Sequence, residues 1–150
     1  MLYSELQCSE AIHKAVERMG FAEMTEIQEK TIPVMLAGHD VIAKAPTGTG
    51  KTCAFGIPVA EHIQPENKYP QAVIMAPTRE LAQQIAEELS NLTYFMPEVQ
   101  AACVYGGANM EKQAKRLAEG CQIVVATPGR LMDHYKHHSI DISHVTQIVL

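Results

Sequence analysis

The stretch from Ala45 to Thr52 has the residue types of a phosphate-binding loop. It consists of Ala45, Pro46, Thr47, Gly48, Thr49, Gly50, Lys51 and Thr52. Glycines at 48 and 50 allow the positive φ that brings successive N–H groups toward an anion, and a following helix directs its positive end to the same place. Lys51 is suited to the β- and γ-phosphates and the Thr52 hydroxyl to Mg²⁺. The sequence therefore predicts a nucleotide site, with a plain glycine-rich turn as the alternative.

Two further loops combine a helix-capping threonine with an arginine. Thr78 precedes Arg79, and Thr127 is predicted to cap a helix that begins with Pro128 and includes Gly129 and Arg130. A helix amino terminus with free N–H groups, a hydroxyl and a guanidinium binds phosphate well. Taken alone, each loop is better explained by capping with solvated arginines. With the small residues Gly106 and Gly107 after a third strand, the set predicts a track for a sugar-phosphate chain.

These loops follow apolar segments that alternate with amphipathic ones. The strands are expected near residues 41–45, 72–76, 99–104, 122–126 and 145–150, and the helices near 50–63, 79–92, 110–118 and 131–137. Continuously apolar strands separated by helices indicate parallel pairing with both sheet faces covered. The fold class is α/β, a doubly wound, mostly parallel sheet. Ligands of such sheets bind at the carboxyl ends of the strands, where the loops above lie.

Residues 1–40 are expected to form a region packed on the nucleotide-binding domain at 41–150. Ser9 precedes a helical pattern that stops at Gly20, and Tyr3 is an apolar position expected to dock on the domain. Thr25 and Gln28 have the spacing of a capping box, in which each side chain bonds to the backbone of the other residue. Gln28 is therefore expected to help cap the second helix.

Bulk composition limits the classes of protein. The chain has 150 residues, of which 47% are hydrophobic and 19% charged, as in a single globular domain. No apolar run approaches the roughly 18 residues that span a bilayer, and no signal peptide is recognisable, so a cytoplasmic location without membrane contact is expected. The four cysteines form no C-x-x-C pair. A net charge of −5 excludes a general basic coat and restricts nucleic-acid binding to local sites.

Several histidines gather near the carboxyl end. His134 and His138 are spaced i, i+4, with His137 and His144 nearby. No carboxylate is placed to orient them as metal ligands usually are. A solvated helix face is the preferred interpretation, and a metal site the alternative.

The motifs together resemble those of the DEAD-box RNA helicases along essentially the whole chain. Residues 20–28, with Tyr3 upstream, resemble the Q motif, and 45–52 resemble motif I. Residues 77–82 match motif Ia, Gly106-Gly107 the GG motif, and 127–130 motif Ib. Met24 and Glu26 stand where the family usually has prolines.

The resemblance implies a RecA-like domain that binds ATP or ADP with Mg²⁺ and grips RNA. Tyr3, Phe21 and Gln28 would contact adenine, and 45–52 the phosphates, with Lys51 and Thr52 in catalytic positions and Thr52 as metal ligand. The RNA backbone would be bound, without base selection, by Pro77, Thr78, Arg79, Gly106, Gly107, Thr127, Pro128, Gly129 and Arg130.

The chain ends before the place where the D-E-A-D segment and a second RecA-like domain would follow. The expectation is a truncated first domain that holds nucleotide but hardly hydrolyses it, because phosphoryl transfer needs the missing carboxylates and arginines. Two other classes stay open: a non-catalytic RNA-binding module, and a small-molecule kinase, which would need more than the four arginines present.

Overall fold

The structure is a computed structural model that describes residues 1–45 and 50–150. It divides into two compact units. The amino-terminal unit comprises Met1–His62 and Asn91–Pro97, and the sheet unit comprises Ile63–Ser90 and Glu98–Leu150. The predicted boundary near residue 40 stays a prediction.

The amino-terminal unit is helical. It contains the short 3₁₀ helix η1 (Tyr3–Glu5) and the helices α1 (Glu10–Arg18), α2 (Glu26–Leu36) and α3 (Lys51–Glu61). α2 packs on α3, and α1 contacts η1. As predicted, the Ser9 side chain caps α1 and Gly20 follows its end with φ +82°. Tyr3 is buried, as expected for an apolar position that docks on its neighbours. The packing of residues 1–40 on a domain at 41–150 stays a prediction.

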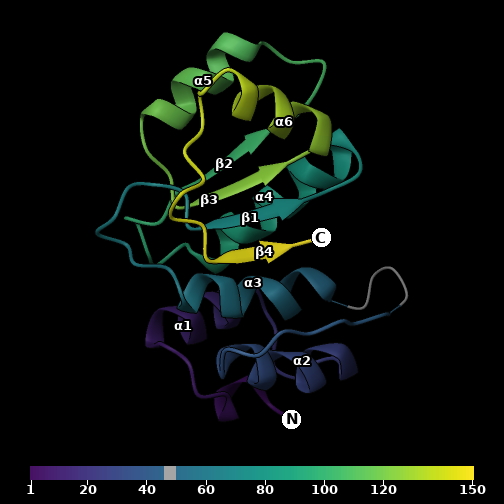
Figure 1. The fold of residues 1–150 in the computed structure, drawn as a ribbon. Helices are drawn as coiled ribbons and strands as arrows, with labels where there is room; N and C mark the ends of the chain where they lie inside the picture. The colour runs from purple at the N-terminus through teal and green to yellow at the C-terminus, as the bar shows by residue number, and fades with distance from the viewer. Residues whose placement is uncertain (46–49) are drawn as a thin grey trace. The chain divides into compact units, whose positions relative to one another are not determined.

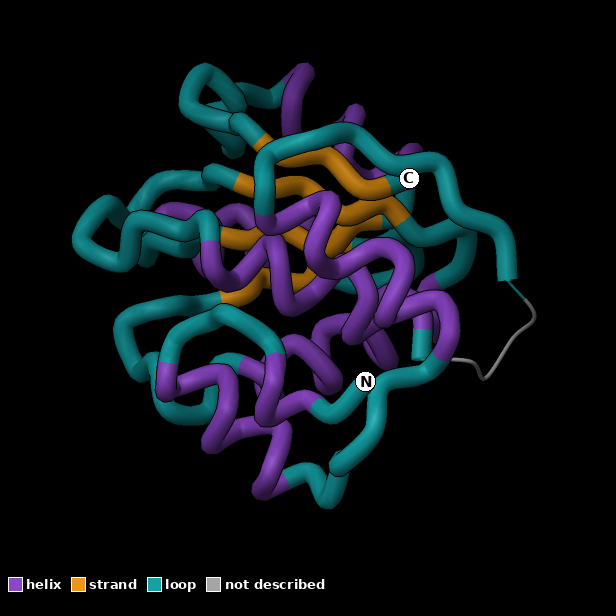
Figure 2. Tube along the Cα trace, turned by 90° about the horizontal axis from the view of Figure 1, so that it is seen from below, coloured by secondary structure: helices purple, strands orange, loops and turns teal. Residues whose placement is uncertain are grey.

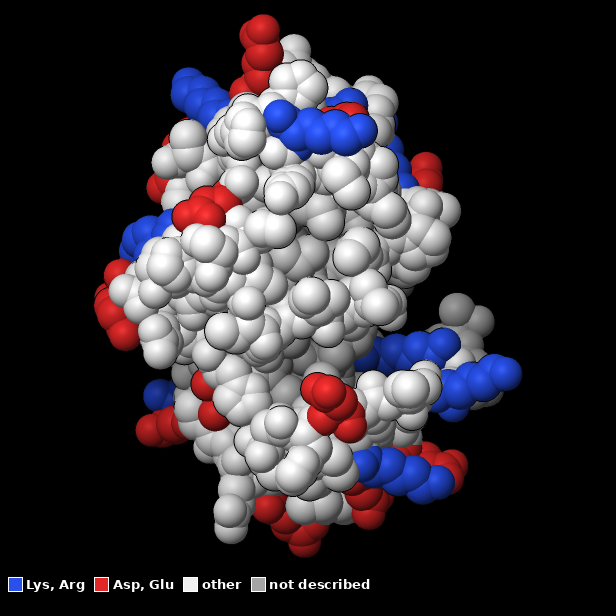
Figure 3. Space-filling model, viewed as in Figure 1, with Lys and Arg blue, Asp and Glu red and all other residues white. Residues whose placement is uncertain are grey.

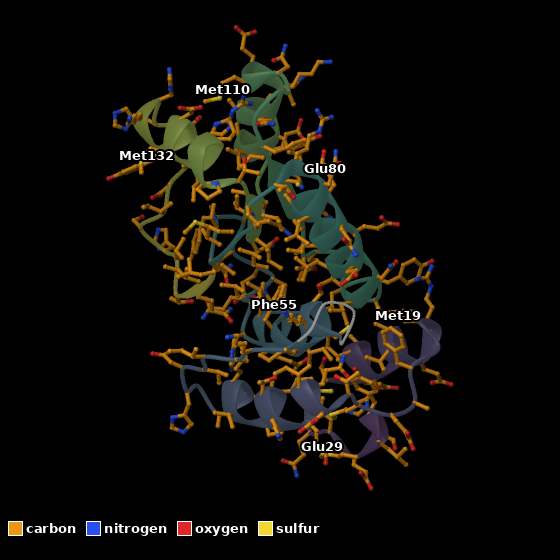
Figure 4. The ribbon with its side chains drawn as sticks, turned by 90° about the vertical axis from the view of Figure 1, so that its right-hand side faces the viewer. Met19, Glu29, Phe55, Glu80, Met110 and Met132 are labelled. Atoms are coloured by element: carbon orange, nitrogen blue, oxygen red, sulfur yellow. The ribbon has the colours of Figure 1, made fainter. Side chains whose placement is uncertain are left out.

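The sheet unit contains four strands and three helices. The strands are β1 (Ala72–Met75), β2 (Ala101–Val104), β3 (Ile123–Ala126) and β4 (Gln147–Val149), and the helices are α4 (Arg79–Leu92, whose last two residues belong to the other unit), α5 (Met110–Ala118) and α6 (Pro128–Lys136). All strand pairs are parallel, in the order β2-β3-β1-β4 (Figure 1). Figure 2 shows these strands in orange, lying side by side. Figures 1 and 4 show α4 on one face of the sheet and α6 on the other. The doubly wound α/β architecture is thereby confirmed.

One face of the sheet forms a continuous core. Val104 on β2 and Val124 on β3 cluster with Leu117 of α5, and Leu131 of α6 packs against them. The next residue along β3, Val125, points to the opposite face because side chains alternate along a strand. It is also fully buried. Burial on both faces explains why these strands are apolar at every position rather than at every second one.

The prediction of a strand at residues 41–45 is wrong. These residues are described, and none of them belongs to a strand. The side chain of Ile42 is fully exposed. An apolar segment becomes a buried strand only when a neighbour pairs with its backbone and other elements cover its faces. Neither condition is met here, although the local composition is that of a strand.

Candidate functional site

The predicted phosphate loop leads into α3. Gly50 occupies the position before the helix with φ +80°, and no side chain there caps the first turn. The left-handed backbone predicted at Gly50 is confirmed. Lys51 begins the helix and is exposed, and Thr52 is half-buried. Ala45 is half-buried before the loop. Pro46, Thr47, Gly48 and Thr49 lie outside the described residues.

Gln28 connects α2 to the start of α3. The Thr25 N–H donates to Gln28 Oε1 at 3.0 Å, and the Gln28 N–H donates to Thr25 Oγ1 at 3.4 Å. This confirms the predicted capping box. In addition, Gln28 Nε2 donates to the Gly50 carbonyl at 3.0 Å. A Cβ at Gly50 would lie 2.3 Å from that nitrogen, so only glycine accommodates this contact. Gln28 thus caps α2 and also binds Gly50, the residue that precedes α3.

Tyr3 completes this polar cluster. Its hydroxyl donates to Gln28 Oε1, and its ring stacks on Phe21 with 6.3 Å between centroids. Burial, and secondly the proximity of Cys53, raise the pKa of the Tyr3 hydroxyl well above its usual range. Tyr3 therefore stays a neutral donor. Phe21 is 44% exposed and offers one open aromatic surface.

The hydrogen bonds of Gln28 restrict what it can offer a ligand. Oε1 already accepts from Thr25 and Tyr3, which uses both of its lone pairs. Nε2 carries a second proton beyond the one directed at Gly50. An amide can both donate to and accept from adenine. For Gln28 to make both contacts, one of its present partners would have to move.

In the sheet unit, Arg79 lies close to the loop that follows β2. The Thr78 hydroxyl accepts from the Leu81 N–H at 3.2 Å, which confirms the predicted cap of α4. The Arg79 guanidinium lies 4.7 Å from the centre of the Tyr105 ring. A Cβ at Gly107 would lie 3.9 Å from Arg79 Nη1. Arg79 is exposed, so it is available to a ligand at this edge.

The Thr127 side chain does not cap α6 as predicted. Its hydroxyl instead accepts from the Gly106 N–H, at 3.4 Å. Pro128 begins the helix as expected, since proline has no N–H to satisfy there. The correction has a simple cause: the loop after β2 lies alongside and presents an N–H to the hydroxyl. Gly107 adopts φ +83° in that loop.

Arg130 is neither solvated nor free. Its Nη1 donates to the Ala108 carbonyl at 2.9 Å and to Gln113 Oε1 at 3.0 Å. Nε lies 3.7 Å from Asp133 Oδ2, an ion-pair distance too long for a hydrogen bond, and has no hydrogen-bond partner. The side chain is 13% exposed. Arg130 therefore ties the start of α6 to the loop after β2.

The solvated-face interpretation is wrong for His134, which is fully buried. Its ring contacts Gln113 Oε1 and the Ser139 hydroxyl. His137, His138 and His144 are exposed. Among residues 1–45 and 50–150, no three histidine, cysteine or acidic side chains are grouped to hold a metal ion.

Sequence reasoning missed Gln113 altogether, and it missed that His134 is buried. The usable signal was the spacing of Arg130 and His134, four residues apart and therefore on one face of a helix. The core residue Ile140 lies shortly beyond them.

Three loops thus meet at the carboxyl ends of β1, β2 and β3. They contain Pro77, Thr78 and Arg79; Tyr105, Gly106 and Gly107; and Thr127, Pro128, Gly129 and Arg130. Pro77, Pro128 and Gly129 are exposed there. Arg79, Thr127 and Arg130 each contact or approach the middle loop, which agrees with the rule that this edge of a parallel sheet gathers functional loops.

A parallel doubly wound sheet and a helix that begins Lys-Thr directly after a glycine are the features of RecA-like nucleotide-binding domains. Residues 25–150 match the family model described as DEAD/DEAH box helicase. The chain belongs to this family.

Similar proteins agree with the match. The ATP-dependent RNA helicase CshA of Limosilactobacillus reuteri is 49% identical over 150 residues, which cover 100% of this chain and 30% of that protein. The ATP-dependent RNA helicase DeaD of Escherichia coli is 40% identical, over 99% of this chain and 24% of that protein. A crystal structure of a DEAD box protein from Methanococcus jannaschii superposes with a TM-score of 0.90 at 37% identity, covering 99% of this chain and 40% of the other.

The chain therefore spans about 30% of the length of these CshA relatives. Within the described residues, no helix is both long and apolar enough to cross a membrane.

Proposed function

We propose that this chain is the ATP- and RNA-binding part of an ATP-dependent RNA helicase that remodels RNA duplexes. The observation that carries the proposal is the meeting of three strand-exit loops around Gly106 and Gly107, with Arg79 and Thr127 on either side. Family membership supports it, because the relatives named above are RNA helicases.

Nucleotide would be held in the amino-terminal unit. The uncapped start of α3 and the exposed Lys51 fit an anionic group, since free N–H groups and an ammonium stabilise phosphate. Residues 45–52 would contact the phosphates of ATP or ADP, with Thr52 as a ligand of Mg²⁺. The ion would neutralise charge on the transferred phosphoryl group. Adenine would lie against Phe21, near Tyr3 and Gln28.

RNA would be held in the sheet unit through its sugar-phosphate backbone. Thr78 and Arg79 would bind one phosphate, and the N–H groups around Gly106 and Gly107 would approach the chain closely because no side chain intervenes. Thr127, Pro128 and Gly129 would complete the track, with Pro77 beside Thr78. Arg130 would act mainly by holding Ala108, since its Nη1 already has two acceptors.

The nucleotide part is tested by Lys51→Ala. Loss of a charge-assisted contact of roughly 1.5–3 kcal/mol lowers affinity for ADP about tenfold to a hundredfold in calorimetry. Lys14→Ala is the matched control, because Lys14 is an exposed lysine of α1 that pairs with Glu10 on its own helix. Equal ADP affinity of the Lys51→Ala and unaltered chains would contradict the phosphate-loop assignment.

The RNA part is tested by Arg79→Ala with single-stranded RNA of several sequences. A backbone contact predicts a similar loss for every sequence and a shallower salt dependence, by about 0.7 in the slope of log affinity against log salt. Lys14→Ala again controls for net charge. Losses that depend on base identity would contradict a backbone track.

A second RecA-like domain, RNA-dependent turnover and a cytoplasmic location stay predictions for the protein as a whole. The aligned residues make up about 30% of each CshA relative, so those relatives have room for such a domain.

A further inference from the structure

Four polar side chains form a connected cluster between α5, α6 and the segment after α6. They are Gln113, Arg130, His134 and Ser139, called the His134 cluster below. His134 is fully buried and Gln113 is 8% exposed. In Figure 4, α5 with Met110 and α6 with Met132 lie next to each other, as they do in Figure 1. Neither Gln113 nor His134 belongs to the motifs assigned to RNA above.

The hydrogen bonds fix how each group in the cluster is oriented. Gln113 Nε2 donates to the Tyr105 carbonyl at 2.9 Å, so Gln113 Oε1 is the atom that faces Arg130 and His134. Because Oε1 only accepts, His134 Nε2, 3.0 Å away, must carry a proton. With Nε2 protonated in a neutral ring, His134 Nδ1 accepts from the Ser139 hydroxyl at 2.7 Å. That hydroxyl also lies 3.1 Å from the His134 carbonyl, which accepts from the Ser139 N–H at 3.0 Å in either case. A neutral imidazole satisfies every partner.

The cluster holds the glycine loop on both sides. Gln113 binds the carbonyl of Tyr105, just before Gly106, and Arg130 binds the carbonyl of Ala108, just after Gly107. Gly106 and Gly107 have no side chains with which to anchor themselves, and a Cβ at Gly106 would meet nothing within 4 Å. The position of this loop is therefore set by groups outside it.

We propose that Gln113 and His134 are positioning residues for RNA binding: through Gln113 Oε1 they hold Arg130, and with it the Tyr105–Ala108 loop, in the arrangement that receives the RNA backbone. This inference rests on the proposed function and adds two residues that do not touch RNA. His134 donates to the oxygen shared with Arg130, which keeps the Gln113 amide from turning over. In an inverted amide, Nε2 would face the N–H groups of Arg130 and His134, and Oε1 would face the Tyr105 carbonyl. No hydrogen bond could then form on either side.

The alternative is a purely structural role, since buried hydrogen-bonded polar groups also fix helix packing. The two roles differ in what a conservative replacement restores. Glutamine places its amide nitrogen near the position of His134 Nε2, whereas asparagine places it near Nδ1. His134→Gln therefore keeps the donor to Gln113, and His134→Asn loses it while keeping a partner for Ser139.

The experiment measures binding of a single-stranded oligouridylate by fluorescence anisotropy for these two variants. We expect His134→Asn to weaken binding about 3- to 10-fold, the equivalent of one to two hydrogen bonds, and His134→Gln to stay within about twofold of the unaltered chain. ADP affinity should be the same in all three. The control is His137→Asn, which changes an exposed histidine of the same helical region.

A second readout reports on Arg130 directly. Its Nε–H is buried and lacks a hydrogen-bond partner, so its exchange with water is limited by access. In nitrogen-15 spectra, assigned with Arg130→Lys, this exchange should accelerate at least about tenfold in His134→Asn and stay slow in His134→Gln.

If His134→Asn does not fold, Gln113→Glu replaces it. That variant keeps an acceptor for Arg130 and His134 but loses the donor to Tyr105, and should also weaken RNA binding.

The outcomes separate the two proposals. RNA binding that is equal in His134→Asn, His134→Gln and the unaltered chain, or an equal loss in both variants, would overturn the positioning role and leave the proposed function standing. No RNA binding by the unaltered chain would overturn both. A loss in His134→Asn that His134→Gln restores, together with faster Arg130 exchange, supports the inference.

Discussion

At the scale of single residues, Gln28 shows how one side chain serves both structure and a candidate ligand site. It caps α2 through Thr25, accepts from Tyr3 and donates to the Gly50 carbonyl. At 3% exposure, it is a buried polar group whose partners all come from its own unit. Adenine contact and helix capping therefore compete for the same amide and can be separated by mutation.

Gln28→Ala is expected to lower stability and to narrow the difference between ADP and GDP affinity. Removing the side chain leaves the Tyr3 hydroxyl and the Thr25 N–H without their acceptor, at a cost of about 1–3 kcal/mol. Urea denaturation measures the first effect and calorimetry the second. Tyr3→Phe, which removes one donor to Gln28 and keeps the ring, is the control. If stability falls but base preference is unchanged, the capping role is the complete account of Gln28.

His134 makes stability depend on pH. Its burial, and secondly the Arg130 guanidinium, lower the pKa of the His134 imidazole below its ordinary value of 6.5; Asp133 opposes the shift and His137 adds to it. When the pH falls below 6.5, His134 of the unfolded chain binds a proton more readily than His134 of the folded chain. The stabilisation that comes from a neutral, buried His134 is therefore complete above about pH 7 and is lost as the pH falls. His134→Gln should lose less stability than the unaltered chain between about pH 7.5 and 5.5 in urea denaturation. An identical pH dependence would show that His134 does not titrate differently on folding.

At the scale of elements, the loops after β2 and β3 are held to each other by side-chain hydrogen bonds. Thr127 binds Gly106 across 21 residues of sequence and Arg130 binds Ala108 across 22. Figure 3 shows few charged side chains over β4, whereas charged side chains gather at the top and edges of the sheet unit. Charged ligands are therefore expected at the strand-exit loops rather than over β4.

Gly50→Ala tests the junction between the phosphate loop and α3. A non-glycine residue at φ +80° costs roughly 1–2 kcal/mol, and the new Cβ would meet Gln28 Nε2. Loss of stability should therefore accompany weaker ADP binding. Gly106→Ala is the matched control for stability, because it has no close neighbour and no positive φ, and should stay within about 0.5 kcal/mol. Equal stability of Gly50→Ala and the unaltered chain would contradict the requirement for glycine between the phosphate loop and α3.

At the scale of the whole molecule, the chain has two compact units, one with the candidate nucleotide residues and one with the candidate RNA residues. Its net charge is −5, so RNA affinity must come from placed groups such as Arg79 rather than from overall attraction. Such local binding is weak when few phosphates are contacted, and it falls as salt rises.

Residues 1–150 alone are expected to bind nucleotide without RNA-stimulated ATP hydrolysis. Phosphoryl transfer requires carboxylates that hold the metal and orient water, and arginines that stabilise the transition state. The chain spans about 30% of its helicase relatives. Phosphate release measured with and without RNA tests this expectation, and a longer protein with the continuing residues should recover the stimulation. Robust turnover by residues 1–150 would contradict it.

The sequence by itself determined the elements and their local caps. Ser9, the Thr25–Gln28 box, Thr78 and the glycines at helix ends act within three or four residues, so their spacing is sufficient evidence. The order of the motifs likewise indicated the family. Lys51, Thr52 and Arg79 were found as exposed or half-buried groups at the expected helix starts.

Only the tertiary structure decided how side chains pair over longer separations. Residues 41–45 have a strand's composition but no strand, because pairing depends on a neighbour. The Thr127 hydroxyl accepts from the Gly106 N–H. Arg130 and His134 bind Gln113, which is 17 and 21 residues away in the sequence. A buried polar side chain needs a partner, and which distant group becomes that partner is set by packing, which local spacing does not encode.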